Sequence, residues 1–185
     1  MKFRTKSNTK VTQALEALNY DFGAFELNHF LEHIGRLRGR EIVCHGFPFK
    51  EKLFGVWIPR DTRDYIAYNS STYEIHHTHI ILHEVGHMVL NHQPVNLETV
   101  FGSETVQLLE IFSTGTHLDS SSCMVLPRTV EEAYICSNPQ EAEAEEFAAL
   151  VQNHIFRANR FQYLVQTSTT INELRAFTDA LGFQE

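Results

Sequence analysis

The sequence predicts an α+β domain in which helices pack against a small, antiparallel, three-stranded sheet. Apolar residues recur with helical spacing in two early segments, residues 9–18 and 25–38. Three short runs rich in β-branched and aromatic residues then predict strands, at 41–45, 53–58 and 65–68. With 185 residues, of which 43% are hydrophobic, the chain can bury one core of ordinary size.

These elements fit a single domain over residues 1–185, with its core at about 25–160. Asn138 and Pro139 predict the start of a helix rich in alanine and glutamate, and a separate amphipathic helix at 171–182 ends the chain. The pattern is weaker before Asn138. There we expect a helix followed by a polar loop, at 97–112 and 113–123.

The most apolar stretch of the chain, residues 78–91, contains His83, Glu84 and His87 in an H-E-x-x-H pattern. On a helix, residues four apart lie on one face, about 6 Å apart along the axis, so both imidazoles can bind one zinc ion. The glutamate between them can take the proton of an attacking water molecule. The stretch is apolar on all sides, which indicates a buried helix, and Ser71–Glu74 fits a capping box at its start. Hydrogen-bonded core histidines are the alternative explanation.

A hydrolytic zinc site usually has three protein ligands, so a third must come from another part of the chain. His92 does not fit the extended motif, in which the third histidine stands six residues after the second. His79 is about 12 Å along the helix from His87, so it is better placed to contact a ligand than to be one.

Glu143 is the third ligand that we favour. In the helix after Pro139 it shares one stripe with the apolar residues Phe147 and Val151, where a carboxylate needs a cation or several donors. Glu141 is only the reserve candidate. Its position is equally well explained by a solvated first turn, where an acidic residue suits the positive end of the helix dipole.

The segments H-E-V-G-H-M-V-L-N-H and E-A-E-A-E-E-F-A-A-L resemble the paired helices of the ImmA/IrrE family of bacterial metallopeptidases. The stretch G-V-W-I-P-R-D-T-R-D-Y-I-A-Y-N-S is also similar to members of this family, and the resemblance covers roughly residues 25–153. One departure is Glu145, because many members carry Asn or Asp at this position. It puts a contact to a metal ligand in doubt, and leaves the ligands themselves in place.

The resemblance implies a zincin-like fold with Zn²⁺ as cofactor. It makes His83, His87 and Glu143 the metal ligands and Glu84 the general base. It also implies the substrate, a helix-turn-helix transcriptional repressor whose cleavage switches on mobile-element, phage-defence or DNA-damage genes. Single-stranded DNA is a candidate activator. Two alternatives are a zinc-stabilised module that binds a regulator without cutting it, and the toxin of a toxin–antitoxin pair.

The helix with the H-E-x-x-H pattern follows a predicted hairpin of the runs at 53–58 and 65–68. If residues 65–68 form an edge strand, they can hold an extended peptide by strand addition. A proline there would then harm cleavage more than folding. Tyr68 and His79 are candidates for stabilising the oxyanion or for supporting a metal ligand.

Charge and composition exclude some other classes of protein. The net charge of −8 argues against a general nucleic-acid coat, and the basic cluster at 36–40 is explained as a helix C-terminus, with a local DNA contact as the alternative. No apolar run has membrane-spanning length and no signal core begins the chain, so we expect a cytoplasmic protein without membrane contact.

The three cysteines form no C-x-x-C pair, which argues against a disulfide framework. The simplest explanation is that they are small, buried, apolar side chains. The alternative gives one of them a function. Cys123, in a polar loop, is a candidate inhibitory thiol for the open zinc position.

Overall fold

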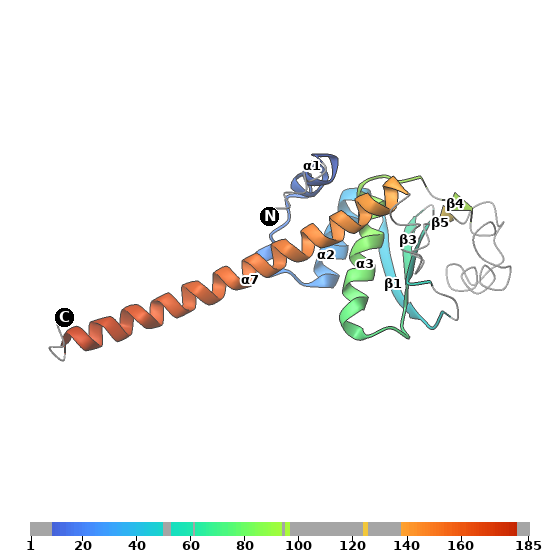
Figure 1. The fold of residues 1–185 in the computed structure, drawn as a ribbon. Helices are drawn as coiled ribbons and strands as arrows, with labels where there is room; N and C mark the ends of the chain where they lie inside the picture. The colour runs from blue at the N-terminus through green and yellow to red at the C-terminus, as the bar shows by residue number, and fades with distance from the viewer. Residues whose placement is uncertain are drawn as a thin grey trace, which may run out of the picture.

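The computed structural model describes residues 9–49, 53–60, 62–93, 95–96, 124–125 and 138–180. In chain order the elements are α1 (Thr9–Ala17), the short 3-10 helix η1 (Phe22–Ala24), α2 (Leu27–Arg38), β1 (Glu41–Phe47), β2 (Gly55–Pro59), β3 (Arg63–Asn69), α3 (Glu74–Val89), β4 (Val95–Asn96), β5 (Met124–Val125) and α7 (Pro139–Ala180). Helices pack against a small sheet, which confirms the predicted α+β class (Figure 1). The helix and loop expected at 97–112 and 113–123 lie outside the described residues. Among the helices described, none is both long and apolar enough to cross a membrane.

The three-stranded sheet is mixed rather than antiparallel. β2 and β3 form the predicted antiparallel hairpin, but β1 runs parallel to β3, and the strand order is β1-β3-β2. The antiparallel expectation is wrong for β1 because the chain passes from β1 to the far side of the sheet before the hairpin returns β3 to the middle. A second pair, β4 and β5, is antiparallel and has no counterpart in the sequence prediction.

The central position of β3 also corrects the expected peptide-binding edge. Residues 65–68 are paired on both sides, since Ile66 lies opposite Cys44 of β1 and Trp57 of β2. This strand therefore has no free edge for a substrate. A proline within it would remove hydrogen bonds from the sheet and damage folding first, contrary to the sequence-based expectation.

α3 is buried between α7 and the strands β2 and β3 (Figure 1). Every residue from Ile80 to Met88 is buried, which confirms the predicted buried helix. The predicted capping box is wrong, because the N-cap residue is Tyr73 and it makes no side-chain capping bond. The Thr72 hydroxyl donates instead to the carbonyl oxygen of Asn69, at 2.8 Å.

α7 is one continuous helix of 42 residues. It begins at Pro139 as predicted, and the Asn138 side chain accepts a hydrogen bond from the backbone N–H of Gln140 at 3.0 Å. As far as the structure describes it, to residue 180, the separate helix expected at 171–182 is instead the last part of α7, because no glycine or proline interrupts residues 140–180. The second half of α7 extends away from the other elements (Figure 1).

The two helices α3 and α7 approach each other closely at Gly86. A Cβ atom added to Gly86 would lie 3.1 Å from both the Cα and the carbonyl oxygen of Ala144, and 3.2 Å from the Cβ of Phe147. Ala144 and Phe147 are themselves fully buried. Small residues on both helices therefore set the distance between them.

A buried carboxylate connects the sheet to the helices. Asp64 of β3 is fully buried and accepts hydrogen bonds from Trp57 Nε1 and Arg38 Nε, both at 3.0 Å. Arg38 also donates to the carbonyl oxygen of Met88 near the end of α3, and Arg40 lies 3.6 Å from the same carboxylate. Two arginines of the basic cluster thus hold β3 against the ends of α2 and α3.

We predict that Asp64→Asn lowers the free energy of unfolding by about 3 kcal/mol, because it leaves a partly buried arginine without its counter-charge. Chemical denaturation followed by circular dichroism measures the change. Glu41→Gln is the control, since its ion pair with Arg63 lies at the surface and its loss should change stability much less. Equal stability losses in the two variants would contradict the prediction.

We also predict that Ala144→Val is more destabilising than Ala149→Val, by about 1–3 kcal/mol. The two substitutions are identical and lie on the same helix, so their helix propensities cancel. Ala144 faces α3, however, whereas Ala149 is exposed. The difference between the two unfolding free energies isolates the close approach of the helices, and a value near zero would refute it.

Candidate metal centre

Three buried side chains meet between α3 and the first turn of α7. His83 and His87 project from α3 with their Nε2 atoms 3.0 Å apart. Glu141 Oε2 lies 3.2 Å from His83 Nε2, and Glu141 Oε1 lies 3.6 Å from His87 Nε2. All three side chains are fully buried, and together they form a group that could hold a metal ion.

The distances suit a tetrahedral cation. Zinc–ligand bonds of about 2.0–2.1 Å place tetrahedral ligand atoms about 3.3 Å from one another, and the three observed separations bracket this value. Glu141 Oε1 is buried and has no hydrogen-bond partner among the described residues. A cation would satisfy this oxygen, so two imidazole nitrogens and one carboxylate fit a divalent metal.

The charges in the cluster also favour a cation. Glu84 and Glu141 are both fully buried, and buried carboxylates are costly unless positive charge accompanies them. Burial opposes a charge on His83, but its hydrogen bonds with Glu141 and Glu145 outweigh burial and raise its pKa to about 9. Burial and the adjacent His83 hold the pKa of His87 well below its ordinary range. A proton on His83 thus provides the positive charge that a metal ion would bring.

Glu84, the predicted general base, lies beside the cluster and against β2. A Cβ atom added to Gly55, at the start of β2, would lie 2.7 Å from Glu84 Oε1 and 2.5 Å from Ile80 Cγ2. Only glycine leaves room for the strand so close to this carboxylate. The H-E-x-x-H helix therefore presents its glutamate at the junction of α3 and β2, next to the two histidines.

The structure places Glu141, rather than Glu143, with the two histidines. Glu143 points toward other partners, since its Oε2 atom lies 2.6 Å from Lys10 Nζ and 3.0 Å from His92 Nε2. The preference for Glu143 is therefore corrected, and the reserve candidate occupies the position of a third ligand.

The reason lies in which face of α7 meets α3. That face is centred on Ala144 and Ala148, both fully buried, and Glu141 stands three residues before Ala144 on the same face. The sequence argument followed the large apolar residues Phe147 and Val151 instead, and Glu143 on that stripe contacts Lys10 and His92. Ala144, opposite Gly86, and the buried Ala148 one turn later are the signal that could have identified Glu141.

His79 is linked to His83 through Glu145, whereas the sequence predicted that it would contact a ligand itself. Its Nε2 atom lies 3.1 Å from Glu145 Oε1, and Glu145 Oε2 lies 3.3 Å from His83 Nδ1. Glu145, which is Asn or Asp in many members of the ImmA/IrrE family, thus contacts the candidate ligand His83. The second ring nitrogen of His79 lies 3.0 Å from Gln152 Oε1.

Tyr68, another candidate, is not among the residues of the cluster. The ring of Tyr68 packs against His77, with centroids 4.8 Å apart, and His77 precedes His83 by about 9 Å along the helix. Cys123 lies outside the described residues, so its role as an inhibitory thiol stays a prediction.

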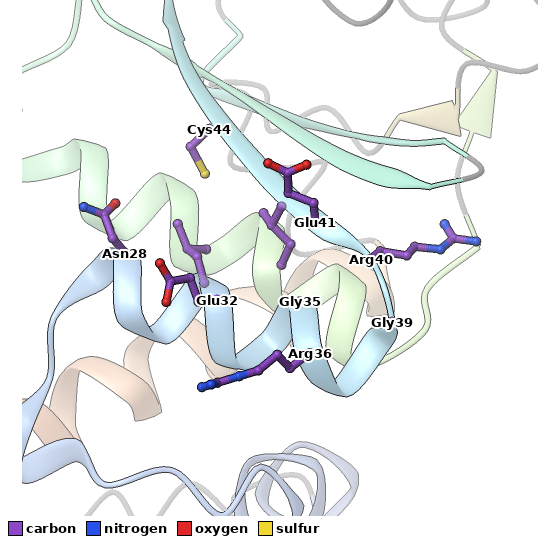
Figure 2. Close-up of a pocket in the computed structure, with 10 residues that line it drawn as sticks. Asn28, Glu32, Gly35, Arg36, Gly39, Arg40, Glu41 and Cys44 are labelled. Atoms are coloured by element: carbon purple, nitrogen blue, oxygen red, sulfur yellow. The ribbon is translucent and has the colours of Figure 1, made fainter.

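A cavity of about 710 Å³ lies elsewhere, between α2 and β1 (Figure 2). Its lining includes Glu32, Arg36, Glu41 and Cys44 and shares no residue with the histidine–glutamate cluster. Burial raises the pKa of Cys44 to about 12, so this thiol stays protonated at neutral pH. The cavity therefore offers neither a metal ligand set nor a reactive thiolate.

Comparison of the chain with protein-family models, with curated proteins and with solved structures finds no match. The chemistry of this centre must therefore be argued from its own residues.

We predict that Glu141→Ala abolishes stoichiometric zinc binding, because it removes the only carboxylate in the cluster that could hold a metal. Elemental analysis of the purified protein after dialysis measures the zinc content. Glu146→Ala, on the same helix, is the matched control and should retain one equivalent. Full occupancy in Glu141→Ala would contradict the assignment.

Proposed function

We propose that this protein is a zinc-dependent endopeptidase of the kind that its H-E-x-x-H and E-x-E-A segments resemble, the ImmA/IrrE metallopeptidases. The observation that carries the proposal is the buried group of His83, His87 and Glu141 with Glu84 beside it. Two imidazoles and one carboxylate are a ligand set of hydrolytic zinc sites, which keep a further position open.

In the proposed reaction Glu84 transfers protons and the other three residues bind the metal. A zinc ion bound here would polarise the carbonyl of the substrate and make water more acidic. Glu84 takes a proton from the attacking water as the new carbon–oxygen bond forms. It then gives this proton to the amine nitrogen as the carbon–nitrogen bond breaks. His83, His87 and Glu141 hold the metal in place throughout.

The proposed substrate is a helix-turn-helix repressor encoded beside this protein, with single-stranded DNA as a candidate activator. This part of the proposal rests on the sequence resemblance alone. It would place the protein in a phage-defence, mobile-element or DNA-damage switch and in the cytoplasm.

A second function has one observation in its favour. All three candidate ligands and Glu84 are fully buried, and closed zinc sites are typical of structural metals. The protein would then be a zinc-stabilised module that binds a regulator without cutting it. Within the described part of the chain the group has three candidate ligands with a glutamate next to them, and this arrangement favours the peptidase.

We predict that Glu84→Gln lowers the cleavage rate at least about 100-fold while zinc content stays unchanged, because only proton transfer is lost. Intact-mass spectrometry of the neighbouring helix-turn-helix protein, incubated with and without single-stranded DNA, measures cleavage. Glu74→Gln, an exposed position on the same helix, is the control and should cleave as the wild type does.

A single cut that requires Glu84 would support the peptidase. If folded, zinc-loaded wild type leaves the partner intact but binds it, and Glu84→Gln binds it equally well, the binding module replaces the peptidase.

A further inference from the structure

A line of three polar side chains leads away from His87, on the side opposite the candidate metal position. His92 Nδ1 lies 2.8 Å from His87 Nδ1, and His92 Nε2 lies 3.0 Å from Glu143 Oε2. Lys10 Nζ of α1 lies 2.6 Å from the same carboxylate oxygen. The residues come from α1, α7 and the chain just after α3, so three separate segments contribute to the line that starts at His87.

The turn that ends α3 explains how His92 reaches His87. Asn91 has a left-handed φ of 57°, and its N–H donates to the carbonyl oxygen of Met88 at 3.3 Å. The N–H of His92 donates to the carbonyl oxygen of His87 at 3.1 Å. These two bonds form a Schellman motif, which brings the side chains of the sixth and first residues together. Such pairs are usually apolar, but here both are histidines.

When His87 binds a metal through Nε2, only one arrangement of protons gives every hydrogen bond of this line a donor and an acceptor. The proton of His87 must then be on Nδ1, which donates to Nδ1 of His92. The proton of His92 must in turn be on Nε2, where it donates to Glu143. The ammonium group of Lys10 contacts the same carboxylate, so the acceptor is also paired with a positive charge.

The other histidine ligand is supported differently. His83 Nδ1 contacts the carboxylate of Glu145 directly, at 3.3 Å. For His87 a second histidine stands between the ring and the carboxylate, and that histidine is almost completely buried, with 5% of its surface exposed. A buried imidazole with a polar partner at each nitrogen is fixed in one orientation.

We propose that His92 and Glu143 are positioning residues, which fix the tautomer and ring orientation of His87 and so raise the affinity of the centre for its metal. The inference rests on the proposed metal site, and does not depend on peptide hydrolysis. It also gives a role to the histidine that misses the extended zinc motif and to the glutamate first favoured as a ligand.

We test the proposal with a pair of variants of nearly equal shape, His92→Asn and His92→Leu, in the full chain. Asparagine can still accept the hydrogen bond from His87 Nδ1, whereas leucine cannot. We expect zinc affinity, measured by competition with a chromophoric chelator, to fall about 10–100-fold in His92→Leu and clearly less in His92→Asn. The visible absorption of bound Co²⁺ should change in the leucine variant only.

Glu143→Gln should weaken zinc binding in the same direction, and the double variant Glu143→Gln, His92→Leu should be no weaker than His92→Leu alone. Lys10→Met should have a smaller effect, because the lysine is half-exposed. His76→Leu, an exposed histidine on α3, is the control and should bind zinc as the wild type does.

The outcomes are distinct from those for peptidase activity. If His92 only fills space, the His92→Leu variant should bind zinc at least as well as the His92→Asn variant. Zinc affinities of both variants within about twofold of the wild-type affinity would overturn the proposal. If the wild type itself binds neither zinc nor Co²⁺, the inference falls together with the metal site. Tight binding by a wild type that cleaves nothing leaves the inference supported and refutes only the peptidase.

Discussion

The close approach of α3 and α7 at Gly86 and Ala144 is the constraint on which the centre depends. The two histidines come from α3 and the Glu141 carboxylate from α7, so the distance between them is set by helix packing. A side chain larger than hydrogen at position 86 would meet the backbone of α7. The glycine of the H-E-x-G-H segment is therefore a packing residue, and it has the same importance for the site as the residues that bear charge.

This close contact has an electrostatic consequence. It buries Glu141 beside two imidazoles that can supply only a proton as counter-charge, and Glu84 is buried nearby against β2. Many of the polar contacts around the centre follow from the need to balance these buried carboxylates. Glu145 and His79 support one imidazole, while His92 and Glu143 support the other. Lys10 then compensates the outermost carboxylate.

Much of this arrangement could be predicted from the sequence, because periodicity and helix signals are local. They located α1, α2, α3, the β2–β3 hairpin and the start of α7, and the spacing of His83 and His87 placed both rings on one face. The parallel pairing of β1 could not be predicted, since it depends on where a loop crosses the sheet. The exchange of Glu141 for Glu143 has a similar origin: a helical wheel gives the relative angle of two residues, but a neighbouring helix decides which angle faces inward.

The unbroken length of α7 links distant parts of the molecule mechanically. The helix is about 63 Å long at 1.5 Å per residue, and its first two turns carry Glu141, Glu143 and Glu145. The other end lies well outside the domain (Figure 1). The helix is held at Ala144, against Gly86, and again at Gln162, whose Nε2 atom donates to the carbonyl oxygen of Gly23 at 2.8 Å. Because an α-helix resists bending, a tilt of the far end against these contacts would move all three carboxylates together.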